Sequence, residues 1–171
     1  MLTTALAESP ALARSDWNPP EEGRPEIDMP EIKIETRFGP ISVDADRLVD
    51  VQGGLLGFPG RRKFALAPIP DERLDRFMLL QSIEDSALSF IVVPLAADAG
   101  LVEAADIAEV CATTGTDEQD ALIVLIVTVR KAEGGIRMTA NLRAPVVVDT
   151  RRLVARQCIF SNSRYPIQQA L

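Results

Sequence analysis

The sequence of 171 residues contains no histidine. Histidine is the most common general base, the usual zinc ligand and the base of Ser-His-Asp and Cys-His arrangements, so the chain cannot carry those arrangements. Carboxylate pairs, lysine or tyrosine could still catalyse a reaction. The sequence nevertheless predicts a protein that is not an enzyme and that needs no metal or cofactor.

Cysteines and aromatic residues are also scarce. The two cysteines, Cys111 and Cys158, are far apart, and neither belongs to a CxxC pair. Isolated thiols are typical of buried residues in a reducing compartment, although one disulfide between them is an alternative. Aromatic residues make up only 5% of the chain, so we expect a core of Val, Ile, Leu and Ala.

Long apolar runs are missing as well. Outside the first residues the longest run is 121–127, far shorter than the roughly 20 residues that a membrane helix requires. Residues 1–13 are rich in Ala and Leu, but they lack a basic start and are interrupted by Glu8 and Pro10. They do not fit a secretion signal. We therefore expect a cytoplasmic protein that does not contact a membrane.

The charge is predominantly negative, with a formal net value of −7. Nucleic-acid phosphates attract clustered Lys and Arg, and the short basic runs at 61–63 and 151–152 fit solvated loops better. The sequence predicts no direct nucleic-acid binding. An acidic chain suits a basic protein partner, because complementary potentials steer association.

The first 31 residues differ from the rest. The first thirty contain five prolines, six acidic residues and two basic ones, with few regularly spaced apolar residues. This composition predicts a disordered, acidic, proline-rich extension at 1–31. Its Trp17 is either a docking anchor or a residue without a binding role.

Residues 32–171 have the pattern of one β domain. Short apolar segments alternate with Gly, Pro and Asp turns, as in sandwiches and barrels, and only 101–111 reads as a helix. The sequence predicts an all-β fold, an antiparallel β-barrel or sandwich-like single domain with one short helix. The expected strands are 32–36, 41–43, 48–51, 64–67, 77–82, 88–93, 121–129, 136–142, 146–148 and 153–160.

Two of these strands allow more specific predictions. Residues 121–129 are almost all branched and aliphatic, which favours a fully buried central strand. A hairpin loop at 131–135 should follow. In the return strand the even-numbered residues should face the core, and the odd-numbered ones the opposite side. The predicted core-facing set is Ile136, Met138, Ala140 and Leu142.

No segment has the features of a catalytic or phosphate-binding motif. The Gly-rich run 53–60 lacks the Lys-Ser/Thr ending of a phosphate loop and contains Phe58-Pro59, so we interpret it as a tight turn. The acidic pairs at 71–72 and 84–85 are interpreted as turn residues. For Asn141, tying the neighbouring backbone and contacting a partner are both open.

Several segments, taken in order, resemble one known family. They are Glu35-Thr36-Arg37-Phe38-Gly39-Pro40-Ile41, Gly53-Gly54-Leu55-Leu56-Gly57-Phe58, Leu80-Gln81-Ser82 before Leu88-Ser89-Phe90, Thr139-Ala140-Asn141-Leu142-Arg143-Ala144-Pro145, and Tyr165-Pro166-Ile167. Together they resemble the flagellar assembly factor FliW family over about 32–171. The segment 95–100 and Asp149 depart from the family pattern.

The resemblance implies a protein that switches between two partners. Proteins of this family bind cytoplasmic flagellin, and they bind the translational repressor CsrA away from its RNA surface. Flagellin export then frees the factor to relieve repression, which is reciprocal linkage between two ligands. We expect the partner-binding residues to include Gln81, Ser82, Asn141, Arg143 and Tyr165.

Two alternatives remain at this stage. One is a chaperone that binds flagellin but not CsrA. The other is a small-ligand β-barrel, or an enzyme that uses carboxylates, which a deep polar pocket would support.

Overall fold

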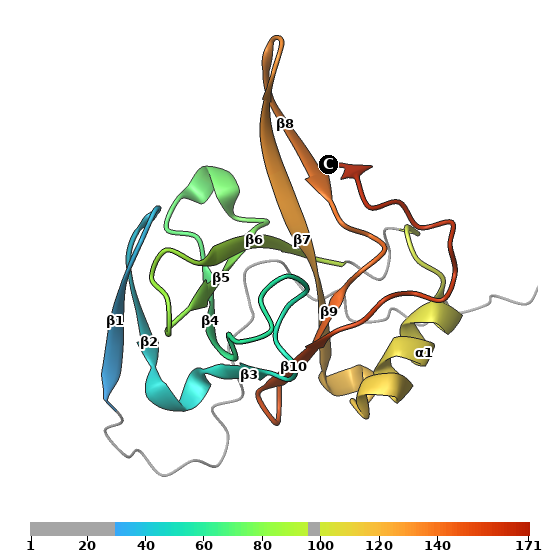
Figure 1. Cartoon of the computed structure of the whole chain (residues 1–171), viewed down its shortest axis with the longest axis horizontal. Helices are drawn as coiled ribbons and strands as arrows, with labels where there is room; N and C mark the ends of the chain where they lie inside the picture. Colours follow the sequence, from blue (N-terminus) through green and yellow to red (C-terminus); the bar gives the residue numbers. More distant parts are fainter. Residues whose placement is uncertain (1–29, 96–99) are drawn as a thin grey trace, which may run out of the picture.

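A computed structural model describes residues 30–95 and 100–171 (Figure 1). The apolar segments form strands, and the Gly- and Pro-containing segments turn between them. The strands are β1 (Glu31–Thr36), β2 (Gly39–Asp44), β3 (Val49–Val51), β4 (Lys63–Pro68), β5 (Met78–Ser82), β6 (Ser89–Pro94), β7 (Ala121–Ala132), β8 (Gly135–Ala140), β9 (Val146–Asp149), β10 (Val154–Gln157) and β11 (Gln169–Ala170). The helices are α1 (Ala104–Thr114) and the 3-10 turns η1 (Ala45–Arg47), η2 (Glu72–Leu74) and η4 (Glu118–Asp120).

The long strand β7 closes seven strands into a barrel. Its neighbours run in the order β7-β6-β5-β4-β3-β10-β9, and β9 pairs again with β7. Residues 121–124 of β7 pair with β9, whereas residues 127–132 pair with β8. The same edge of β7 therefore pairs with the barrel strand β9 along its first part and with the hairpin strand β8 along its second part. The mostly β fold with one α-helix among the described residues confirms the predicted class.

The barrel is mixed rather than purely antiparallel. β10 lies parallel to β3, with Val154 opposite Asp50, while the other pairs of the barrel are antiparallel. This departs from the antiparallel prediction. The cause is the short turn 150–153, which follows β9 and brings β10 back beside β3 without a crossover that links the parallel pair directly.

The barrel interior contains aliphatic side chains with few aromatic ones. The fully buried residues at its centre include Val49, Phe64, Leu80, Val92 and Val124. Burial of this apolar surface is the main stabilising term of the fold. It matches the expectation of a core poor in aromatic residues.

Helix α1 covers one side of the barrel (Figure 1). It buries Val110 and Cys111 against a cluster that includes Ile123 and Cys158. It ends at Gly115, whose φ of 67° is the left-handed conformation that glycine adopts at helix C-termini. Both cysteines are buried free thiols, as predicted, and burial raises the pKa of each. The helix begins and ends three residues later than expected.

The hairpin β1–β2 forms a separate two-stranded sheet on the outside of the barrel. Ile34 and Ile41 bury their side chains against Ala65, Leu79 and Val127. The alternation Ile32, Ile34, Thr36 thus predicted this strand correctly, although it begins at Glu31.

The second hairpin, β7–β8, corrects two predictions. β7 continues to Ala132, and only Glu133 and Gly134 form the turn, because Ala132 still pairs with Gly135. Val129 is 44% exposed and Ile136 is 71% exposed, so neither is a core residue. The even-numbered residues of β8 share one face, as predicted. Between Met138 and the hairpin turn, however, the barrel does not cover this face, so Ile136 is exposed.

The two ends of the chain and the lengths of its helices bear on the remaining predictions. The extension 1–31 and Trp17 lie outside the described residues, apart from Pro30 and Glu31. Near the end of the chain, the short strand β11 pairs with β8. Among residues 30–95 and 100–171, no helix is both long enough and apolar enough to cross a membrane.

Candidate partner-binding surfaces

Gln81 lies in β5 and is fully buried. Its Nε2 donates to the carbonyl oxygens of Ser82 at 2.9 Å, Leu88 at 3.0 Å and Ser86 at 3.2 Å. Its Oε1 is buried and accepts no hydrogen bond from a described residue. The side chain thus holds the β5–β6 loop in place.

Ser82, the last residue of β5, holds the start of the same loop. It is fully buried, and its Oγ accepts hydrogen bonds from the N–H groups of Glu84 and Asp85, both at 3.2 Å. Glu84 in turn accepts from the N–H groups of Lys63 and Arg62, and these two bonds lower the pKa of its carboxyl. The LQS segment therefore ties the β5–β6 loop to the start of β4.

Asn141 and Arg143 lie directly after β8, where the chain turns toward β9. Asn141 Oδ1 accepts hydrogen bonds from the N–H groups of Arg143 and Ala144, both at 3.1 Å. Its own N–H donates to the carbonyl of Ile126 at 2.9 Å. This geometry is what the backbone-tying interpretation requires. Asn141 and Arg143 are both partly exposed, so this turn also offers polar atoms to the surface.

Tyr165 attaches the C-terminal segment to α1. It is 5% exposed, and its hydroxyl donates to Asp106 and accepts from the N–H of Glu103 at 3.1 Å. Its ring packs on Phe160 with centroids 4.9 Å apart. Arg164 pairs with Glu103, and the hydrogen bond that Arg164 donates to this carboxylate is the main cause of the raised pKa of Arg164. Tyr165 is therefore a positioning residue for this part of the surface.

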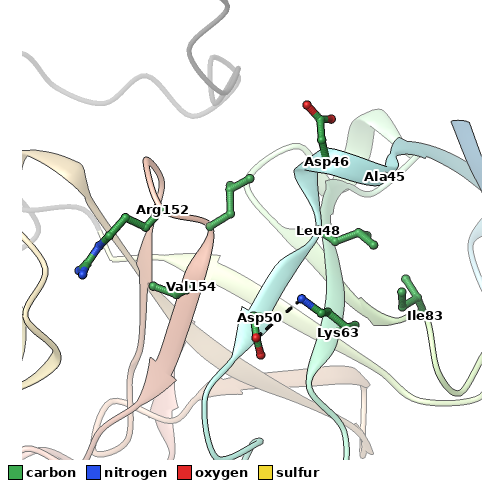
Figure 2. A pocket seen from close by; sticks show the side chains of 9 residues that line it. Ala45, Asp46, Leu48, Asp50, Lys63, Ile83, Arg152 and Val154 are labelled. Carbon is green, nitrogen blue, oxygen red and sulfur yellow. Dashed lines mark ion pairs between the residues drawn. The ribbon is translucent and has the colours of Figure 1, made fainter. Parts of the chain in front are cut away.

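A groove of about 510 Å³ lies between β3, β4 and β10. Figure 2 shows Asp50 and Lys63 side by side in its lining as an ion pair, with Arg152 pointing away. Asp50 also pairs with Arg62 at 2.9 Å. The charges in the groove are therefore largely compensated within the chain, and no nucleophile with an adjacent general base is seen among the lining residues.

The turn 150–153 beside the groove is held by the buried carboxylate of Asp149. Asp149 is 3% exposed, and it accepts hydrogen bonds from Arg151 N–H, Arg152 N–H and the Arg152 guanidinium. Burial is the largest single influence and raises the pKa of Asp149, but these bonds together outweigh it and lower the pKa. The turn includes Leu153 at a φ of 55°, which is uncommon for a residue with a branched side chain.

The β7–β8 hairpin is a surface that the sequence interpretation missed. It projects beyond the barrel (Figure 1). Val129 and Ile136 are exposed aliphatic residues on it, and the chain returns beside it with the 42% exposed Leu171. The available signal was that 127–130 and 136–139 alternate apolar and polar residues, as half-exposed strands do.

The described part of the chain contains no cluster of three or more Cys, Asp or Glu residues placed to hold a metal ion. The sequence-predicted residues lie in three separate places: the β5–β6 loop, the turn after β8 and the contact with α1. A small β-barrel with a compensated surface groove and a projecting hairpin has the features of a protein-binding module.

The fold matches a solved assembly factor. The chain superimposes on the protein of "Crystal structure of the flagellar assembly factor FliW" with a TM-score of 0.61 and 23% identity, over 82% of this chain and 96% of that one. The class is therefore that of a small β-barrel with the fold of an assembly factor.

Sequence comparison places the chain more specifically. Residues 33–171 match the family model described as FliW protein. The "Flagellar assembly factor FliW" of Geobacter sulfurreducens is 32% identical over 133 residues, covering 76% of this chain and 79% of the relative. That of Geobacillus sp. is 30% identical over 150 residues, covering 82% and 95%. The chain belongs to the FliW family. This is a family of non-enzymatic flagellar assembly factors, which confirms the prediction that the chain is not an enzyme.

Proposed function

We propose that the chain binds flagellin in the cytoplasm and, when flagellin is exported, binds and antagonises the translational repressor CsrA. The observation that carries this proposal is the family match over residues 33–171, which spans nearly the whole described domain. Two ligands that compete for one protein are thermodynamically linked, so flagellin occupancy sets how much CsrA is free to repress.

The charge of the chain supports a protein partner of the CsrA kind. A net charge of −7 complements a basic RNA-binding protein and disfavours direct contact with RNA. Long-range attraction of this sort raises the association rate, and salt screens it within about 10 Å at 0.1 M ionic strength.

Within the predicted site, we assign direct contact to Asn141 and Arg143 and positioning to the three buried residues. Gln81 and Ser82 hold the β5–β6 loop, and Tyr165 holds the C-terminal segment on α1. A change at a buried residue should therefore reduce partner binding only as far as it disturbs its loop.

Co-elution of the full chain with flagellin and, separately, with CsrA tests the proposal. We expect a complex with each, and release of CsrA when flagellin is added to the CsrA complex. Arg143→Ala should weaken at least one complex, whereas Arg151→Ala, an exposed arginine in a different turn, should weaken neither. Binding to flagellin without binding to CsrA would indicate the chaperone alternative, and binding to neither would contradict the proposal.

A further inference from the structure

The outer edge of β8 lacks a strand partner along part of its length. β11 pairs with Ala140 and Thr139, and the next contact is the N–H of Leu171 donating to Met138 at 3.2 Å. Residues 135–137 are paired on the β7 side, with no described strand on the other. Backbone groups alternate in direction along a strand, so the N–H and C=O of Ile136 point outward like the carbonyl of Met138.

The two faces of this hairpin have different chemistry. Val129 lies opposite Met138 on one face, and Ile136 follows Met138 on the same side. Leu171, which continues the pairing of β11, adds a further exposed aliphatic side chain there. Lys131 lies directly opposite Ile136 on this same face, so the face is aliphatic apart from one lysine, and it lies close to the free edge.

The opposite face carries two arginines at a single paired position. Arg130 lies directly across from Arg137, and both are exposed. Like charges directly opposite each other in a sheet are destabilising. Neither arginine, nor neighbouring Lys131, forms an ion pair with any described residue. The hairpin is thus locally basic on a chain of net charge −7, and no carboxylate of the described residues pairs with these side chains.

We propose that β8 binds an extended segment of a partner protein that adds as a strand beside residues 135–138, with carboxylates over Arg130 and Arg137 and aliphatic side chains over Val129 and Ile136. Main-chain hydrogen bonds would give affinity and the alternating side chains specificity. β11 already uses this edge in the same way. A second copy of the chain is disfavoured as the occupant, because two basic edges repel each other.

This basic hairpin surface is separate from the overall negative charge that we propose attracts CsrA. It recognises an acidic, alternating segment, so its success or failure does not depend on either named partner. The test uses the full chain and a short, fluorescently labelled synthetic peptide in which glutamate and valine alternate.

We expect this peptide to bind the protein, and a peptide with lysine in place of glutamate not to bind. Arg137→Glu should weaken binding by roughly tenfold or more, because it replaces attraction by repulsion. Arg156→Glu, the same change at an exposed arginine on β10, should leave binding unchanged. Raising the salt concentration should weaken binding of the glutamate peptide.

The backbone contribution is tested separately. Ile136→Pro removes an N–H that points away from β7, so the β7–β8 ladder should survive while peptide binding is lost. Two peptides provide the same test without changing the protein, each N-methylated at one of the two alternating sets of residues. The peptide that is methylated at the residues whose N–H groups face β8 should not bind.

Equal binding to wild type and to Arg137→Glu would overturn the proposal, as would equal binding of methylated and unmethylated peptides or no binding of any peptide. Self-association of the free chain that Ile136→Pro abolishes would assign the edge to a second copy instead, and would also overturn it.

Discussion

The two halves of β7 belong to one continuous strand but lie in different surroundings. Residues 122–125 and 127 are buried in the barrel wall, and pairing with β9 and β6 fixes both edges of that half. Residues 128–132 are exposed and pair with β8. The first half is packed on both faces, whereas the second half has solvent on both. The comparison teaches that one strand can support the fold with one half and leave the other half exposed, and the exposed half is the one for which we propose a partner.

The same substitution in each half tests this comparison most strongly. Val124→Ala should lower the free energy of unfolding by about 2–3 kcal/mol, since two buried methyl groups are lost and a cavity remains. Val129→Ala should cost less than about 0.5 kcal/mol, because its side chain is 44% exposed. Urea denaturation of both variants measures the difference. Equal losses would show that the hairpin half is as much a part of the core as the barrel half.

The turn that follows the hairpin connects the two regions. Asn141→Ala should cost about 1–3 kcal/mol, because the N–H groups of Arg143 and Ala144 lose their acceptor. Asn141→Asp is the matched control, since it keeps the acceptor oxygen. Melting temperature and partner co-elution are measured together. Wild-type stability with lost binding would make Asn141 a contact residue, and no effect on either would contradict both interpretations.

The contact between Tyr165 and α1 should contribute less. Tyr165→Phe keeps the packing on Phe160 but removes the hydrogen bonds to Asp106 and Glu103, at an expected cost of about 1–2 kcal/mol. Thermal unfolding gives the value. Since this contact lies on the barrel side, the variant should still bind the acidic peptide at β8. Loss of peptide binding with unchanged stability would contradict the separation of the two regions.

The smallest expected effect concerns pH. Hydrogen bonds outweigh burial and leave the pKa of Asp149 below its ordinary value of 3.8. Its stabilisation is therefore complete above the unfolded pKa and is lost as pH falls through the lower, folded pKa. The stability difference between wild type and Asp149→Asn should be constant near neutral pH and shrink below about pH 4. Urea denaturation across this range measures it. A difference that grows toward low pH would mean that the pKa is raised.

The fold was largely predictable because its signals are local. The run 121–127 identified the central strand, and the helix-favouring segment 101–111 located the helix to within three residues at each end. The parallel pairing of β10 with β3 was not predictable, since it depends on where the four-residue turn 150–153 directs the chain. The exposure of Ile136 depends equally on the absence of a wall opposite it. Periodicity gives a side chain's face but not what lies across from that face.

The candidate site was predictable only in part. Asn141 was correctly considered for tying the backbone, because its amide can satisfy neighbouring N–H groups at a strand end. The burial of Gln81 was not foreseen, since it is a polar residue that a family motif alone places on no particular face. The Arg130–Arg137 opposition needed the hairpin register, which a turn of two rather than five residues sets.

Amide hydrogen exchange along β7 and β8 tests the central claim most directly, namely that one half of this strand supports the barrel and the other binds a partner. Amides of residues 122–127 should exchange only with global unfolding, and those of residues 129–138 much faster in the free protein. Adding the glutamate–valine peptide should slow exchange in the second group alone, with the outward N–H of Ile136 most affected. Uniform protection along β7 in the free chain, or hairpin amides that the peptide leaves unchanged, would contradict the account.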